Sequence, residues 1–286
     1  MTFSVQLGLL LALGTSFGSV AGFLYKFRGA REAPAVELRR PLHSTLQLFR
    51  SPVYTLGIVV ALASWGLHVG ALALAPISLV QSVIAGGLVL LTVVADRLFG
   101  IAVTRREWIS VALTAAGLAF LAATLTGDGG GAHSRYDPTT LAIYLVAVGG
   151  VGLAVGVCVR RAPALAVSAG LLWAASDTSI KALSSHLHKL GPLVLVQPLA
   201  LVILVASLIG LLMSARSLQL GDAVPVIAVT SAAANLTTIA AGPIVFAEPL
   251  PSGGLQLTLR LLAFALVVVA AALTPPPAAG LGAAHT

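Results

Sequence analysis

The fold of this chain is decided by residues 71–108, which read ALALAPISLVQSVIAGGLVLLTVVADRLFGIAVTRREW. They contain the end of one apolar segment, a break at Pro76, and a second apolar segment that runs to about Phe99. An arginine-rich loop follows and leads into a third apolar segment. Proline removes a backbone N–H and ends or kinks a helix, so this stretch predicts apolar helices joined by short connections. A similar pattern returns at 215–254, and we expect two variations of one unit.

The composition does not fit a soluble protein. Of 286 residues, 58% are hydrophobic and only 9% are charged, and the mean hydropathy is +1.03. A soluble domain has about a quarter charged residues. The net charge of +7 comes from basic residues in short loops between apolar runs, and these residues are not interleaved with aromatics. We therefore expect the lipid bilayer as a partner, and no nucleic acid.

Nine stretches are long and apolar enough to cross a bilayer, which takes about 20 residues of helix. Gly, Ala and Leu dominate them, which indicates helices and not the strands of a barrel. Their approximate bounds are 5–25, 53–75, 77–99, 108–126, 139–159, 163–184, 192–214, 223–246 and 255–274. The predicted fold class is an all-α integral membrane protein with about nine transmembrane helices.

The distribution of lysine and arginine predicts the orientation of these helices. With the N-terminus outside and the C-terminus in the cytoplasm, twelve of the sixteen Lys and Arg residues fall on the cytoplasmic side. This bias follows the positive-inside rule. Lys26, the first basic residue, comes after the first apolar stretch. We therefore expect a retained first helix, not a cleaved signal peptide, in a protein of the plasma membrane.

The largest connector spans residues 27–52. Pro41 predicts the start of a short helix, in which Leu42, Leu46 and Phe49 share one face at helical spacing. Arginine and histidine residues flank that face, which suits the surface of an anionic membrane. An interfacial helix is one interpretation of this connector, and a solvated basic loop is the other.

The chain divides into a first repeat of four helices (1–126) and a second of five (139–274). A Gly-rich loop, 127–138, joins them, and we expect the Pro/Ala-rich tail, 275–286, to be disordered. The first apolar stretch shares an Ala-x-Gly core with 139–159, and later residues align pairwise. The aligned pairs are Leu72/Leu218, Leu74/Leu220, Val80/Val226 and Val83/Val229. The two units run in opposite directions, as in the inverted repeats of secondary transporters.

The motifs of both units resemble the drug/metabolite transporter (DMT) superfamily, in particular its EamA-like and NIPA-like magnesium transporter branches. ALALAPISLVQSV followed by RLFG, TRREW and AGLAFL is similar to the third to fifth helices of the family, and GPIVFAEPL is similar to its second-half ending. The resemblance implies a transporter with inverted repeats. Two features differ from the family. Ile101 follows Gly100 where members commonly carry Glu, and the connector 27–52 replaces one helix of the usual five plus five.

Glycines mark two expected faces of close helix packing. They recur at three- and four-residue spacing, which lets helices approach closely in lipid. The two sets are Gly14, Gly18 and Gly22 in the first span, and Gly149, Gly152 and Gly156 in the fifth. They predict packing and carry no chemistry.

Ionisable side chains at membrane depth are costly, so each is a functional candidate. Asp177 lies about 18 Å into its span. Lys181 follows at i+4, the spacing of an ion pair on one helix face. The two residues form either a neutralised structural pair or a proton- or substrate-coupled carboxylate with its partner.

Further polar side chains are expected along the same pathway. Asn235 lies near the middle of the eighth span and either joins helices or lines the path, since an amide in hydrocarbon needs partners. His68 and Gln81 lie in the outer half of the second and third spans. His68 is there either a packing residue or a proton relay. Gln197 and Trp173 complete the expected outer-half cavity.

Other chemistry is expected to be absent or structural. Glu248 is expected to pair with Arg260 at the outer rim, where such a pair contributes little. Residues 14–18 match the G-x-S-x-G nucleophile elbow, but that motif needs a strand–turn–helix context. Cys158, the single cysteine, rules out an intramolecular disulfide. We expect no enzyme and no cofactor, and the sequence leaves a metal site open.

The sequence predicts a nine-helix secondary transporter that moves a small metabolite, drug or ion by alternating access. A divalent-cation permease is the first alternative, which the NIPA-like layout suggests, although Mg²⁺ prefers several oxygen ligands. A non-transporting membrane scaffold and an intramembrane hydrolase acting through Ser16 are the others. Homodimerisation is left open.

Overall fold

The computed structural model describes residues 3–37, 40–86, 135–187 and 191–248, with scattered positions at 94–117 and 253–263. Over these ranges the chain is helical and contains no strand. The long helices are α1 (Phe3–Glu32), α3 (Pro52–Leu74), α7 (Pro138–Cys158), α8 (Ala162–Ser184), α10 (Pro198–Leu220) and α11 (Ala223–Val245). The others are α2 (Pro41–Phe49), α4 (Ile77–Gly86) and the 3-10 helix η1 (Gly191–Val196).

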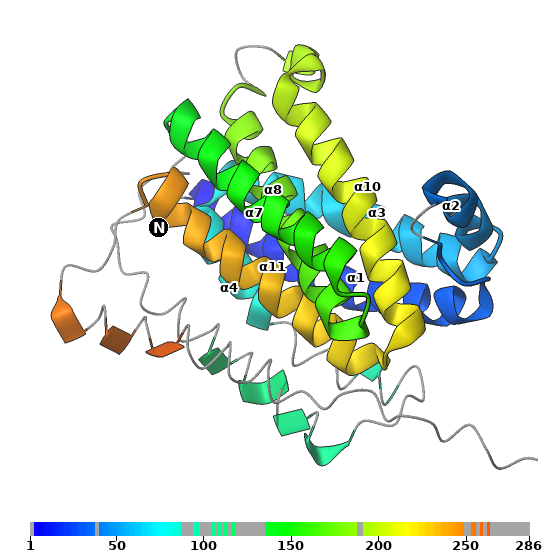
Figure 1. Ribbon diagram of the computed structural model, residues 1–286. Helices are drawn as coiled ribbons and strands as arrows, with labels where there is room; N and C mark the ends of the chain where they lie inside the picture. The colour runs from blue at the N-terminus through cyan, green and yellow to red at the C-terminus, as the bar shows by residue number, and fades with distance from the viewer. Residues whose placement is uncertain are drawn as a thin grey trace, which may run out of the picture.

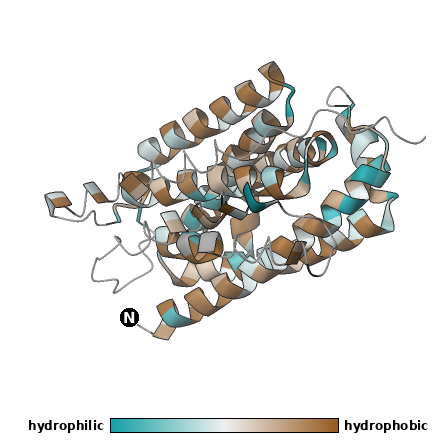
Figure 2. Ribbon diagram, turned by 90° about the horizontal axis from the view of Figure 1, so that it is seen from below, coloured by the Kyte–Doolittle hydropathy of each residue, from teal (hydrophilic) through white to brown (hydrophobic). Residues whose placement is uncertain are grey.

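Within the described residues, five helices are long and apolar enough to cross a membrane, namely α1, α3, α7, α10 and α11. Their outward sides carry exposed large apolar side chains, such as Leu10, Val146 and Leu204. Hydrophobic residues make up most of the helical ribbon (Figure 2). Soluble proteins rarely expose apolar surface of this extent. The described part of the chain is therefore an all-helical protein whose surface suits a lipid bilayer.

Most predicted spans agree with the described helices to within a few residues, with two differences. α1 continues past residue 25 to Glu32, and α10 runs from Pro198 to Leu220 and not over 192–214. Proline suits the first turn of a helix, where its missing N–H has no partner to lose. Gly191, at a φ of +51°, instead begins η1. Most of the predicted spans 108–126 and 255–274, the second half of 77–99, most of the inter-repeat loop and the tail lie outside the described residues.

α8 is the helix around which the second half of the chain packs. It contacts α7, α10 and α11, and it also touches α3. α7 and α10 flank it in Figure 1. Of its 23 residues, 16 are buried. α8 is as long as α3, α10 and α11 but is not among the five helices that could cross a membrane, so the helix that carries Asp177 and Lys181 packs against helices that are.

Glycines allow α1 and α3 to lie antiparallel at close range. A Cβ on Gly18 would lie 2.9 Å from the Cβ of Ser64, and one on Gly22 would lie 3.2 Å from the backbone N of Ala61. The predicted packing face on α1 is thus confirmed. On α7, Gly152 and Gly156 face α8, but a Cβ on Gly149 would meet nothing within 4 Å among the described atoms. The prediction was wrong for Gly149. It shares a helix face with Gly152 and Gly156, but of these three glycines only Gly152 and Gly156 lie in close contact with α8.

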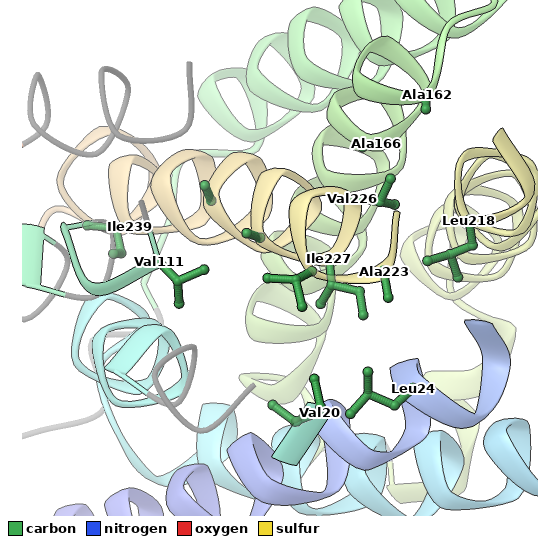
Figure 3. Close-up of a cluster of buried hydrophobic side chains, with 14 of the residues drawn as sticks. Val20, Leu24, Val111, Ala162, Ala166, Leu218, Ala223, Val226, Ile227 and Ile239 are labelled. Carbon is green, nitrogen blue, oxygen red and sulfur yellow. The ribbon is translucent and has the colours of Figure 1, made fainter. Parts of the chain in front are cut away.

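The largest apolar cluster joins the start of the chain to its second half. Figure 3 shows Val20 and Leu24 of α1 directed toward Leu218 of α10 and Ile227 of α11. Ala166 of α8 belongs to the same cluster. α1 is therefore held by α3 on one side and by the second half of the chain on the other.

The connector contains the predicted short helix, α2. Proline lies in its first turn, and Leu42, Leu46 and Phe49 are 82%, 67% and 41% exposed. Leu48 is buried on the other side. α2 lies at the end of the bundle where α1 ends and α3 begins (Figure 1). The short helix with its exposed apolar face is thus confirmed, and its contact with lipid is a prediction.

A nitroxide label at Leu46→Cys, in a Cys158→Ser background, is expected to lie in the membrane interface. In anionic liposomes the label should be relaxed more by oxygen than by a water-soluble nickel complex, because oxygen partitions into lipid. Power-saturation electron paramagnetic resonance measures both. His43→Cys, which is exposed on the same helix, is the matched control and should favour the nickel complex. Dominant nickel relaxation at residue 46 would instead support the solvated loop.

Candidate functional site

Asp177 is held by two buried polar side chains from the first half of the chain. Nε2 of His68 on α3 lies 3.1 Å from its Oδ1, and Nε2 of Gln81 on α4 donates to its Oδ2 at 3.0 Å. His68 is 6% exposed and Gln81 is 2% exposed. Three of the predicted pathway residues therefore meet, one from each of α3, α4 and α8.

The other nitrogen of His68 has no partner. Nδ1 is buried and makes no hydrogen bond among the described residues. In a neutral imidazole whose Nε2 carries the hydrogen, Nδ1 is a hydrogen-bond acceptor. The Asp177–His68 pair therefore keeps one unused polar atom inside the described part of the bundle.

Lys181 lies one turn further along α8 and binds the end of α3. Its Nζ donates to the carbonyl of Leu72 at 2.8 Å and to that of Ala75 at 2.7 Å. A cation is favoured at a helix C-terminus, where carbonyls lack helical partners. The described residues include no ion pair between Lys181 and Asp177, so the predicted pair is not formed. The long lysine side chain reaches these carbonyls instead.

Glu248 binds the start of α4. Its Oε1 accepts a hydrogen bond from the backbone N of Ile77 at 2.8 Å, and its Oε2 accepts one from the hydroxyl of Ser78. The residue before it, Ala247, has a φ of +50°. A Cβ on Gly242 would collide with the carboxylate, so only glycine leaves room for it there.

The predicted exposure of Glu248 to water was wrong. The residue is only 6% exposed, and its carboxylate lies at a helix N-terminus, where negative charge is favoured. Arg260, its predicted partner, lies outside the described residues. Lys181 and Glu248 thus bind the two sides of one interruption, residues Ala75 and Pro76 between α3 and α4, which we call the first break.

A second break, Gly221 and Asp222, separates α10 from α11 and is also bound by a cation. Nη2 of Arg31, near the end of α1, donates to the carbonyl of Gly221 at 2.9 Å. The same nitrogen lies 3.7 Å from Oδ1 of Asp222. Gln219 adds hydrogen bonds to the carbonyls of Ala30 and Pro34. The sequence showed Arg31 only as a loop charge, and the two-residue gap between apolar segments was the available signal.

The remaining predicted residues lie apart from the Asp177 cluster. Asn235 is buried in α11, and Gln197 directly precedes α10. Trp173 lies one turn before Asp177 but packs against Phe23 of α1, at 5.5 Å between ring centroids. Within the described ranges, no hydrogen bond or ion pair connects these three residues to the cluster. The structure therefore unites Asp177, His68 and Gln81, places Lys181 beside them, and leaves the other three separate.

The structure also bears on a metal site and on a nucleophile elbow at Ser16. In the part of the chain that the structure describes, no three His, Cys, Asp or Glu side chains gather as metal ligands would. Ser16 lies within the continuous helix α1, and its Oγ donates to the carbonyl of Ile84 at 3.5 Å. That position lacks the strand–turn–helix context of a nucleophile elbow.

Comparisons of the chain with protein-family models, with curated proteins and with solved structures give no match. The assignment of a function therefore depends on the Asp177–His68 pair, the two breaks and the pattern of helices.

Proposed function

We propose that this chain is a secondary transporter of the plasma membrane that moves a small metabolite, drug or ion by alternating access. The Asp177–His68 pair is its proton-coupled element. The pair carries the proposal because the carboxylate of Asp177, whose side chain is only 17% exposed, lies 3.1 Å from the buried imidazole of His68 on α3, a helix of membrane-spanning length. Asp177 is about 22 Å along α8 from Ala162. Ionisable groups at such depth are rare and usually serve transport or proton relay.

The helix bounds support a DMT-like fold of nine helices in two inverted repeats. α3 and α10 each have 23 residues and each carry proline in the first turn. A two-residue break follows both, before α4 and α11 begin at Ile77 and Ala223. The same residue offset relates the starts, the ends and the aligned pairs from Leu72/Leu218 to Val83/Val229. The N-terminus outside and the C-terminus in the cytoplasm follow from the distribution of basic residues.

Reconstitution into liposomes tests this function. The purified chain should accumulate at least one member of a panel of metabolites and drugs when a pH gradient is imposed, and a protonophore should abolish the accumulation. Empty liposomes are the control. Uptake of Mg²⁺ alone, independent of the gradient, would support the divalent-cation permease. No uptake from the whole panel, in either direction of the gradient, would contradict transport.

A further inference from the structure

The two breaks are bound in the same way by cations from opposite halves of the chain. Nζ of Lys181 donates to the carbonyl of Ala75, and Nη2 of Arg31 donates to the carbonyl of Gly221. Ala75 and Gly221 are the first residues of the two breaks and occupy matching positions after 23-residue helices. Lys181 lies near the end of α8, and Arg31 lies near the end of α1. Each repeat therefore supplies a cation to the break of the other repeat.

The two breaks lie at opposite ends of the bundle. A Cβ on Gly8, near the start of α1, would be 2.9 Å from the Cβ of Ala75. Arg31, which binds Gly221, is near the other end of the same helix. Gly8 and Arg31 are about 35 Å apart along α1. This separation matches the roughly 30 Å thickness of the bilayer core, so the breaks lie near its two faces.

We propose that Lys181 and Arg31 are symmetry-related latches that close the two ends of the transport path. Each latch is a cation that holds the C-terminal carbonyls of a helix at a break. An acidic side chain stands at the same break in both cases: Glu248 on the N-terminus of α4, and Asp222 directly before α11. The gating role rests on the proposed function, because alternating access requires one end to open while the other stays closed.

The two latches differ in their access to water. The Lys181 side chain is fully buried, whereas the side chains of Arg31 and Asp222 are 48% and 55% exposed. Exposed ion pairs are weakened by solvent. The latch at the second break, formed by Arg31, is therefore the weaker of the two. In the transport cycle, the end of the path at Gly221 and Asp222 opens first.

The same contacts identify the helices that correspond in the two repeats. α1 packs against α3 and α4, and α8 packs against α10 and α11. Each of these two helices also supplies the cation that binds the break of the other repeat. α8 is therefore the counterpart of α1. α7, which touches mainly α8, becomes the additional helix of the second repeat. The sequence alignment had paired the first apolar stretch with 139–159.

Hydrogen–deuterium exchange of the full chain in nanodiscs tests the latches without any substrate. Lys181→Met should speed exchange by roughly tenfold in peptides covering 72–82, since a charge-assisted hydrogen bond is lost there, and should leave 218–228 unchanged. Arg31→Gln should speed exchange in peptides covering 218–228 and leave 72–82 unchanged. Lys181→Arg and Arg31→Lys retain the cation and should exchange more slowly than the neutral variants. His186→Gln, just past the end of α8, is the matched control and should resemble the parent chain.

Two results would overturn the latches. One is unchanged exchange at both breaks in the neutral variants, and the other is equal acceleration at both breaks by either substitution, which indicates general loosening. These measurements need no transport activity. If the chain takes up nothing in liposomes but shows the selective hydrogen exchange, the transport function is refuted. The contacts of Lys181 and Arg31 with the breaks are then still supported. Uptake without selective exchange would refute the latches alone.

Discussion

Asp177→Asn is expected to reduce uptake to the level of empty liposomes and to remove its dependence on pH. Asparagine has nearly the shape of aspartate, so its amide oxygen can still accept a hydrogen bond from His68 or Gln81. It has no carboxyl group, so it cannot carry the proton that the proposed coupling requires. The measurement is the initial rate of uptake between pH 5 and 8, with and without an imposed gradient.

Asp137→Asn is the matched control for this substitution. Asp137 is exposed, stands directly before α7, and accepts hydrogen bonds from the backbone N and hydroxyl of Thr140. Asparagine is an equally good N-cap, so this variant should transport like the parent. His68→Gln should keep measurable uptake but change the pH profile, because it removes the imidazole that lies 3.1 Å from the carboxylate of Asp177. If Asp177→Asn keeps both the rate and the pH profile, Asp177 has a structural role only.

Gly170→Val is expected to destabilise the fold by about 1–3 kcal/mol, the usual cost of overpacking. Gly170 lies where α8 closely approaches α11. A Cβ there would lie 2.5 Å from the carbonyl oxygen of Thr230 and 2.7 Å from the Cβ of Ala233. The atoms that it would meet belong to the backbone and to a Cβ of α11, so they cannot move aside as the end of a flexible side chain could. The Asp177 cluster lies two turns further along α8, so uptake should fall together with stability.

Thermal unfolding in detergent micelles, followed by circular dichroism, measures this effect. Gly149→Val is the matched control, because it places the same β-branched side chain in a helix at a position that faces open space. Its unfolding temperature should change little. Equal loss of stability in both variants would show that helix propensity, not packing against α11, determines the cost.

Hydropathy and spacing predicted much of the helical pattern and part of the site. Most of the described helices follow the predicted spans because each depends on local composition and on prolines such as Pro52, whereas the start of α10 at Pro198 was missed. The grouping of Asp177 with His68 and Gln81 was also predicted, since intramembrane polar groups must find one another in a medium without water.

Contacts between helix ends could not be predicted from local sequence. Glu248 follows a short turn after α11, and its sequence neighbours indicate an aqueous rim. Its burial depends on the strained backbone at Ala247 and on the position of α4, which is 171 residues away in the chain. Arg31 likewise binds Gly221 across 190 residues. Such pairs follow from the three-dimensional register of helices, which hydropathy does not encode.

The polarity of α8 has a consequence for how the chain is made. An aspartate or a lysine costs about 2.5–3.5 kcal/mol at the centre of a helix that enters a membrane alone, and α8 carries both Asp177 and, near its end, Lys181. Only three residues, Val159 to Arg161, separate α8 from the apolar α7, on which it packs. α7 and α8 are thus suited to enter the bilayer as one hairpin. α8 then depends on α10 and α11, which are synthesised later, to take it out of contact with lipid.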